Sequence, residues 1–157
     1  MNSNRLEVPN ATWLDLMADL RQRGGGKRES GAFLLGQMQG YTRHVRSWVA
    51  YDDLDPEALT KGYVRLGTAA FTKLWAVCEA RRQVVVADVH THPREPHQSL
   101  SDRTNPMVSQ AGHMALIVPR YAQGEVTPRS VSVNVYLGAK SWASYLDREA
   151  EARVFLV

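Results

Sequence analysis

The segment VVVADVHTHPREPHQSLSD, residues 84–102, places three histidines and three acids directly after an apolar run. Imidazole and carboxylate groups are zinc ligands in proteins, and an open zinc site with one bound water is typical of hydrolases. In an extended strand alternate side chains face the same way, so His90 and His92 can face one point while Thr91 faces away. We therefore predict that these two histidines bind a metal ion.

The third ligand has to come from an acid or histidine elsewhere in the segment. Two prolines restrict the loop that carries Glu95 and His97, which disfavours both as ligands and assigns them to the surface. Asp102 lies ten residues beyond His92, where a helix can start and direct a carboxylate into the site. We predict Asp102 as the third ligand. Asp88 is expected either to orient one of the two histidines or to be a solvated or hydrogen-bonded acid.

Composition limits the classes of protein to consider. The chain has 157 residues, of which 44% are apolar and 22% charged, so we expect a single domain, residues 1–157, with a core that needs no structural metal. The formal charge of +3 comes from scattered lysines and arginines, so no nucleic-acid partner is expected. Cys78 is the only cysteine, which excludes an intrachain disulfide and a cysteine-rich zinc site. Without a signal sequence or a long apolar run, we expect a cytoplasmic protein with no membrane partner.

Hydrophobic periodicity places the candidate residues on alternating helices and strands. The predicted helices cover residues 11–22, a segment that starts at 68, and 142–153; the predicted strands cover 31–37, 44–51, 63–66, 84–86, 113–119 and 130–137. A short turn from Ser101 and a new helix near Pro106, capped by Asn105, are expected after the metal-binding segment. This order of elements predicts an α/β sandwich with a mixed central sheet.

Two blocks of the chain resemble the JAMM (MPN+) family. The run HTHP at 90–93 followed by SLSD at 99–102 is similar to the family's His-x-His-Pro and Ser-x-x-Asp motif. Upstream, ESGAFLLG at 29–36 is similar to the family's Glu-x-x-Gly-x-Leu-Leu-Gly first strand. The blocks are sixty-one positions apart, from 29 to 90, with a predicted hairpin and helix between them. Both blocks occur in order, so the resemblance, which extends over residues 29–119, is specific.

The resemblance implies a JAMM/MPN (cytidine-deaminase-like) fold, a three-layer α-β-α sandwich with a mixed central sheet. It also implies a zinc metallopeptidase, a deubiquitinase-like isopeptidase that cleaves after the C-terminal glycine of a ubiquitin-like protein. Such an enzyme deconjugates or matures that protein, which is its substrate partner, and a further partner from a conjugation system is conceivable. One zinc ion would be held by His90, His92 and Asp102.

The resemblance also implies two catalytic residues. Glu29 would be the general base that takes a proton from water and passes it to the departing amine. Ser99, which matches the motif's serine, would donate a hydrogen bond to the oxyanion. Ser101 stays an alternative, because the loop 94–98 has five residues where the family usually has six.

The sequence leaves two other functions open. A metal-free MPN-like scaffold subunit would show broken motif positions, whereas Glu29, His90, His92 and Asp102 are all present. A hydrolase of the same fold could instead act on a sulfur-carrier protein or another peptide. The chain resembles compact prokaryotic members without large insertions, so we expect substrate contacts from the core domain, from residues 52–62, or from a second subunit.

Overall fold

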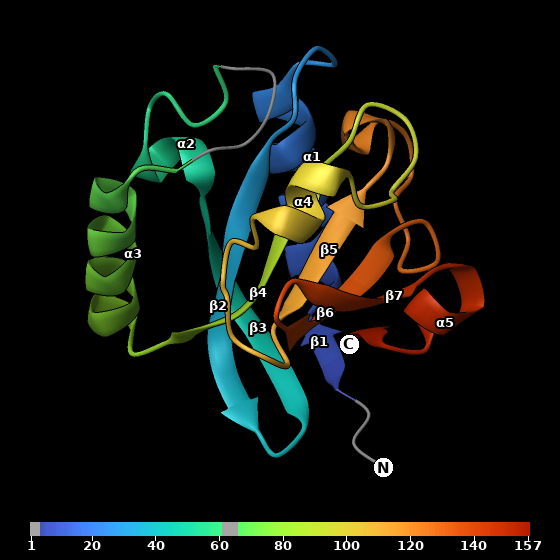
Figure 1. Cartoon of the computed structure of the whole chain (residues 1–157). Coiled ribbons are helices and arrows are strands. Elements are labelled where there is room, and N and C mark those ends of the chain that lie inside the picture. Colours follow the sequence, from blue (N-terminus) through green and yellow to red (C-terminus); the bar gives the residue numbers. More distant parts are fainter. Residues whose placement is uncertain (1–3, 61–65) are drawn as a thin grey trace.

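An eight-stranded sheet runs through the part of the chain that the computed structural model describes, residues 4–60 and 66–157 (Figure 1). The strands are β1 (Arg5–Val8), β2 (Gly31–Gln39), β3 (Thr42–Ala50), β4 (Val84–Thr91), β5 (Met114–Val118), β6 (Ser132–Gly138), β7 (Ser141–Tyr145) and β8 (Val154–Leu156). The helices are α1 (Asn10–Gly24), α2 (Tyr51–Leu54), α3 (Thr68–Arg81), α4 (Leu100–Thr104), α5 (Asp147–Glu151) and the 3-10 turn η1 (Arg120–Ala122). The fold is therefore α/β, as the sequence predicts.

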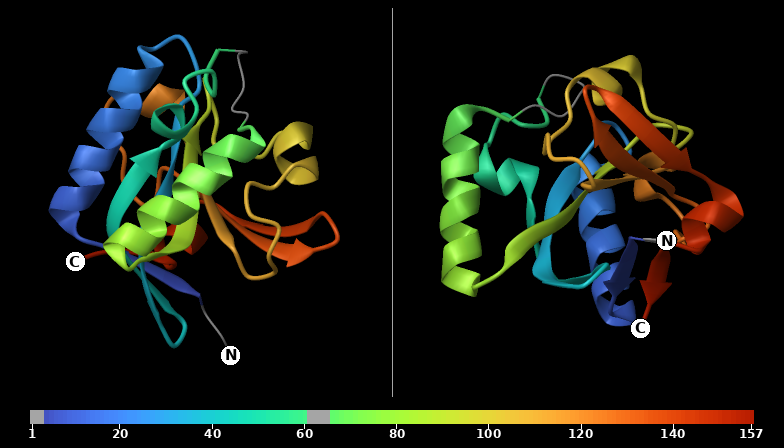
Figure 2. Two further views of the ribbon diagram at one scale, coloured as in Figure 1. Left: turned by 90° about the vertical axis from the view of Figure 1, so that its left-hand side faces the viewer. Right: turned by 60° about the horizontal axis from the view of Figure 1, so that its bottom comes forward.

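The sheet is mixed and curled (Figures 1 and 2). Its strand order is β7-β6-β5-β4-β2-β3-β1-β8. Strand β4 is parallel to β5, and β1 is parallel to both β3 and β8, whereas the β2–β3, β2–β4, β5–β6 and β6–β7 pairs are antiparallel. The prediction of a mixed sheet is thus confirmed, and β4, which carries the two histidines, lies in its middle.

Strand β2 is buried on both faces, which explains its continuous apolar sequence. Ala32 and Leu34 belong to the core that packs against α1, whereas Phe33 and Leu35 belong to a second core formed with α2 and α3. Helices α1 and α3 accordingly lie on opposite faces of β2 (Figure 2). This double burial makes β2 a rigid neighbour for β4, with which it pairs from Gly31 to Gly36.

The predicted helix over residues 142–153 is wrong. Its first part is strand β7, which pairs with β6 through a two-residue turn, and its remainder is the short helix α5. Ala139 and Lys140 both have positive φ, 50° and 61°, as a tight hairpin with the right-handed twist requires. The ring of Trp142 packs on that of Tyr136 at 4.9 Å between centroids, so pairing with β6 outweighs the local helical pattern. The apolar end of the chain forms β8 beside β1, and the sequence patterns predicted neither of these two short strands.

The expected helix near Pro106 is also wrong. Helix α4 begins at Leu100 with Ser99 as its N-cap, and Asn105 is the residue that ends it, not the cap of a new helix. Residues 105–113 form no helix. The reason is a capping box between Ser99 and Asp102, which starts the helix earlier than the proline pattern indicates.

Two further expectations concern segments near the gap in the described residues. Of the predicted strand 63–66, only residue 66 is described, and it lies in no strand; the others, like 61 and 62 of the segment 52–62, lie outside the described residues.

Among residues 4–60 and 66–157, no helix has both the length and the apolar character to cross a membrane.

Candidate metal centre

The side chains of His90 and His92 converge at the end of β4. Their Nε2 atoms lie 3.1 Å apart and their ring centroids 4.9 Å apart. Thr91 faces the other way, where its Oγ1 accepts a hydrogen bond from the Ser30 amide at 2.9 Å. The His92 amide donates to the Val118 carbonyl at 2.9 Å, so the second histidine is held by hydrogen bonding to the end of β5. The strand geometry therefore places the two imidazoles together, as alternation predicts.

Asp102 reaches the same point from the first turn of α4. Its Oδ1 lies 3.3 Å from His90 Nε2, and its Oδ2 lies 3.1 Å from His92 Nε2. The Ser99 amide donates to Oδ2 at 2.8 Å, and the Asp102 amide donates in return to Ser99 Oγ at 3.1 Å. Burial by itself would raise the pKa of Asp102, but the hydrogen bonds from both histidines outweigh burial and hold that pKa well below its ordinary value.

These three residues fit a zinc ion. In a tetrahedral site with zinc–ligand distances of about 2.0–2.1 Å, neighbouring ligand atoms lie about 3.3 Å apart. The Nε2 atoms of His90 and His92 lie 3.1 Å apart, and Asp102 approaches them with its two different oxygens, Oδ1 at 3.3 Å from His90 Nε2 and Oδ2 at 3.1 Å from His92 Nε2. Two imidazoles and one carboxylate are also a donor set that zinc accepts with a fourth position open.

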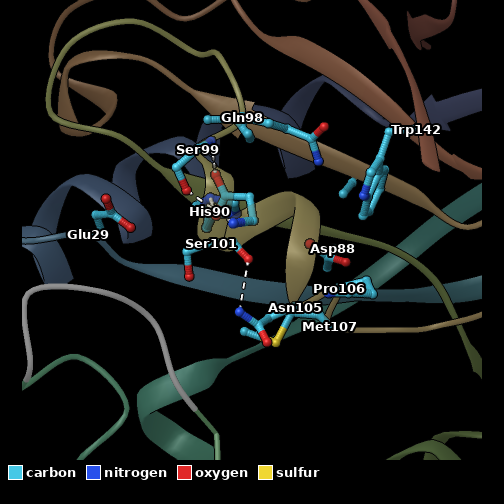
Figure 3. A pocket seen from close by; sticks show the side chains of 13 residues that line it. Glu29, Asp88, His90, Gln98, Ser99, Ser101, Asn105, Pro106, Met107 and Trp142 are labelled. Carbon is cyan, nitrogen blue, oxygen red and sulfur yellow. Dashed lines mark hydrogen bonds and ion pairs between the residues drawn. The ribbon is translucent and has the colours of Figure 1, made fainter. Parts of the chain in front are cut away.

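Glu29, in the segment that leads into β2, lines the same pocket as His90 (Figure 3). One ligand atom each of Glu29, His90 and His92 lies within 4.8 Å of the others, so Glu29 is a second oxygen donor within reach of a metal ion. Asp102 is the other candidate for the oxygen ligand, with Oδ1 at 3.3 Å from His90 Nε2 and Oδ2 at 3.1 Å from His92 Nε2. Burial raises the pKa of Glu29, and the two histidines offset that rise only in part. A carboxyl group with a raised pKa beside a metal site is suited to proton transfer.

Ser99 and Ser101 both line the small pocket at the centre, which has a volume of about 110 Å³. Because Ser99 Oγ accepts the Asp102 amide in the capping box, its own proton stays available for donation to another oxygen. Ser101 contributes its carbonyl oxygen to a bond from the Asn105 amide at 2.9 Å. The capping box holds the Ser99 side chain in a fixed orientation, and the choice of Ser99 over Ser101 as oxyanion donor stays a prediction.

The other acids and histidines of the predicted segment have partners of their own. Asp88 Oδ2 lies 2.6 Å from His113 Nε2, and both residues are buried. Of the two expectations for Asp88, the hydrogen-bonded acid is therefore the one observed. His97 pairs with Glu95 at 3.1 Å, and both are exposed, as expected for surface residues.

Glycine at position 31 is required next to the first histidine. Gly31 is the partner of His90 across the β2–β4 pair. A Cβ atom on Gly31 would lie 2.4 Å from Cε2 of Tyr51 and 2.7 Å from the Val89 carbonyl oxygen. Any larger residue would push the Tyr51 ring or β4 away, so this glycine keeps the histidine strand in place.

The residues that line the pocket but were not predicted as site residues include Gln98 and Trp142. Gln98 lies in the loop before α4, and Trp142 comes from β7, far along the chain (Figure 3). The indole Nε1 of Trp142 donates to the carbonyl of Arg103 at 3.1 Å, which joins β7 to the end of α4. The signal available in the sequence was the alternation in SWASY, which follows the β6 strand after two residues and is typical of a hairpin.

No protein-family model matches the chain. Among solved structures, the chain is similar to protein DSY2949 from Desulfitobacterium hafniense, with a TM-score of 0.67 and 16% identity over 97% of this chain and 92% of that one. It is also similar to a protein from Salinibacter ruber, with a TM-score of 0.54 and 17% identity over 85% of this chain and 88% of that one. At such low identity these likenesses show a shared fold.

Proposed function

We propose that the chain is a zinc-dependent peptidase of the JAMM (MPN+) type, with that family's three-layer α-β-α sandwich as its fold. One observation carries the proposal: Nε2 of His90, Nε2 of His92 and the carboxylate of Asp102 converge with mutual distances of 3.1 to 3.3 Å. Glu29 approaches the same histidines within 4.8 Å. Metal, base and pocket would thus be together at the end of β4.

Each residue has a chemical role in this proposal. Zinc bound by His90, His92 and Asp102 would supply a Lewis acid that makes hydroxide available near neutral pH. Glu29 would take the proton that water loses and hand it to the amine that departs. The Ser99 hydroxyl would donate to the carbonyl oxygen of the cleaved bond as negative charge develops there. The capping box would keep the side chains of Ser99 and Asp102 in a fixed relative position during these steps.

The proposed substrate is a ubiquitin-like protein, cut after its C-terminal glycine. The assignment of a ubiquitin-like substrate follows from the resemblance of the two sequence blocks to the JAMM (MPN+) family. Glycine has no side chain and allows the closest approach of a backbone to a surface. Removal of an attached amine and trimming of a precursor would both use the same site.

The test combines metal analysis with a cleavage assay. Purified protein loaded with zinc is incubated with ubiquitin-like proteins that carry an amide-linked amine or a C-terminal extension, and mass spectrometry locates the cut. We expect about one zinc per chain, cleavage after glycine, and loss of cleavage in Glu29→Gln with zinc content unchanged. Glu95→Gln is the matched control, because it makes the same chemical change at an exposed carboxylate outside the pocket.

Three outcomes would contradict the proposal in different ways. Protein that takes up no zinc would favour the metal-free scaffold. Zinc uptake without cleavage after glycine would favour a hydrolase of the same fold that acts on another substrate. Full activity of Glu29→Gln would remove Glu29 from the mechanism and leave the metal assignment intact.

A further inference from the structure

A second hollow lies beside the candidate metal centre, and we call it the β6–β7 groove. It has a volume of about 500 Å³ and is lined by β6, β7 and side chains of the segment 97–103. Gln98 and Trp142, both labelled in Figure 3, line this groove as well as the pocket of the metal centre. The groove therefore lies next to the pocket. Its volume lies in the range of sites that bind small molecules or short peptide segments.

The floor of the groove is polar, although it is part of a central sheet. Ser132 and Asn134 of β6 are each 1% exposed. Asn134 Nδ2 donates to Ser132 Oγ at 2.9 Å, and Ser144 Oγ of β7 donates to Asn134 Oδ1 at 2.7 Å. Polar side chains at such buried positions are costly unless they are hydrogen-bonded, and here they bond to one another. Ser132 and Asn134 are therefore satisfied inside the sheet, and the hydroxyl groups that a ligand can reach are those of Ser141 and Ser144, which are exposed.

The charged residues of the groove have one sign. Arg103 and Lys140 line it, and no aspartate or glutamate does so. In the part of the chain that the structure describes, neither cation forms an ion pair, whereas Arg23 bridges to three aspartates elsewhere on the surface. The third basic group of the lining, His97, pairs with Glu95 outside the groove. Two unpaired cations above a polar floor are complementary to a carboxylate.

We propose that the β6–β7 groove binds an acidic, extended stretch of the substrate polypeptide next to the bond that is cut. The inference rests on the proposed function, because Gln98 and Trp142 line both the groove and the cleavage pocket and so place the two next to each other. Arg103 and Lys140 would select a glutamate or aspartate side chain. The exposed hydroxyls of Ser141 and Ser144 would form hydrogen bonds with the peptide.

The test measures binding apart from cleavage. Two fluorescent peptides of equal length end in the same glycines and differ only in having glutamate or glutamine at the preceding positions. Anisotropy with metal-free protein should give about tenfold tighter binding of the glutamate peptide. Lys140→Glu should abolish this preference and favour a third peptide with lysine at those positions. Lys73→Glu, the same charge change on the exposed face of α3, should leave the preference as it is.

The outcomes separate this inference from the proposed function. Equal binding of the two peptides, or an equal loss of preference in Lys73→Glu, would overturn the groove assignment even if cleavage is observed. A glutamate preference that depends on Lys140, without cleavage by the zinc-loaded protein, would support the groove and refute the peptidase. Lys140→Gln serves as a milder variant in case the charge reversal impairs folding, which circular dichroism reports. It should reduce the preference by about threefold, and an unchanged preference in a folded variant would count against the groove.

Discussion

The buried pair of Asp88 and His113 is the polar contact whose loss should cost the most stability. Its atoms lie 2.6 Å apart, and the two side chains are only 3% and 4% exposed. In His113→Ala the carboxylate would stay buried without its partner, which typically costs about 3–5 kcal/mol. Domains of this kind have unfolding free energies of about 5–15 kcal/mol, so the variant would lose about a fifth or more of its stability. At about 2–4 °C for each kcal/mol, the melting temperature should fall by roughly 10 °C.

The matched control is His44→Ala. His44 also faces a carboxylate, that of Glu7 at 3.1 Å, but these side chains are 19% and 22% exposed. A partly solvated pair is worth about 0–1 kcal/mol, so the control should lose little. Urea unfolding followed by circular dichroism gives both free energies, and metal analysis should show unchanged zinc content in both variants. If His113→Ala loses no more stability than His44→Ala, burial does not set the strength of these pairs and the reasoning fails.

Three further predictions follow from the site and the core. For the proposed peptidase activity, Ser99→Ala should lower kcat by about 100-fold or more and should also remove a helix cap worth about 1 kcal/mol. Ser101→Ala should stay within about twofold of wild type, and the opposite order in a kcat measurement would assign the proposed oxyanion role to Ser101. Gly36→Ala would place a Cβ atom 1.7 Å from a carbonyl oxygen of β3 and should destabilise the protein by about 3 kcal/mol in urea unfolding. Gly24→Ala is the control, because the nearest atom to its added Cβ lies at 3.7 Å, and it should be neutral or stabilising. Equal effects of the two variants would contradict a steric cause. Burial raises the pKa of the Cys78 thiol, so a disulfide reagent should label this residue more slowly in the native protein than in protein unfolded in urea, and equal labelling rates would contradict its burial.

The local patterns of the sequence were sufficient for the elements that hold the histidines. Apolar residues at helical spacing predict α1, and the continuous run of apolar residues predicts β2. Alternation along β4 predicts that His90 and His92 face one point, and their Nε2 atoms do lie 3.1 Å apart. These inferences succeed because side-chain direction in a regular strand or helix depends on the backbone of a few neighbouring residues alone.

Contacts between distant parts of the chain determine the features that the local sequence patterns did not predict. The partner of Asp88 is His113, twenty-five positions away, and no local pattern distinguishes that pairing from a solvated acid. Likewise, Trp142 was assigned to a helix by its local sequence, but pairing with β6 makes that segment a strand and brings the indole to the edge of the pocket. Periodicity describes which way a side chain faces along its own element. Which groups it meets depends on sheet order and on packing across the sheet, and these are properties of the folded chain as a whole.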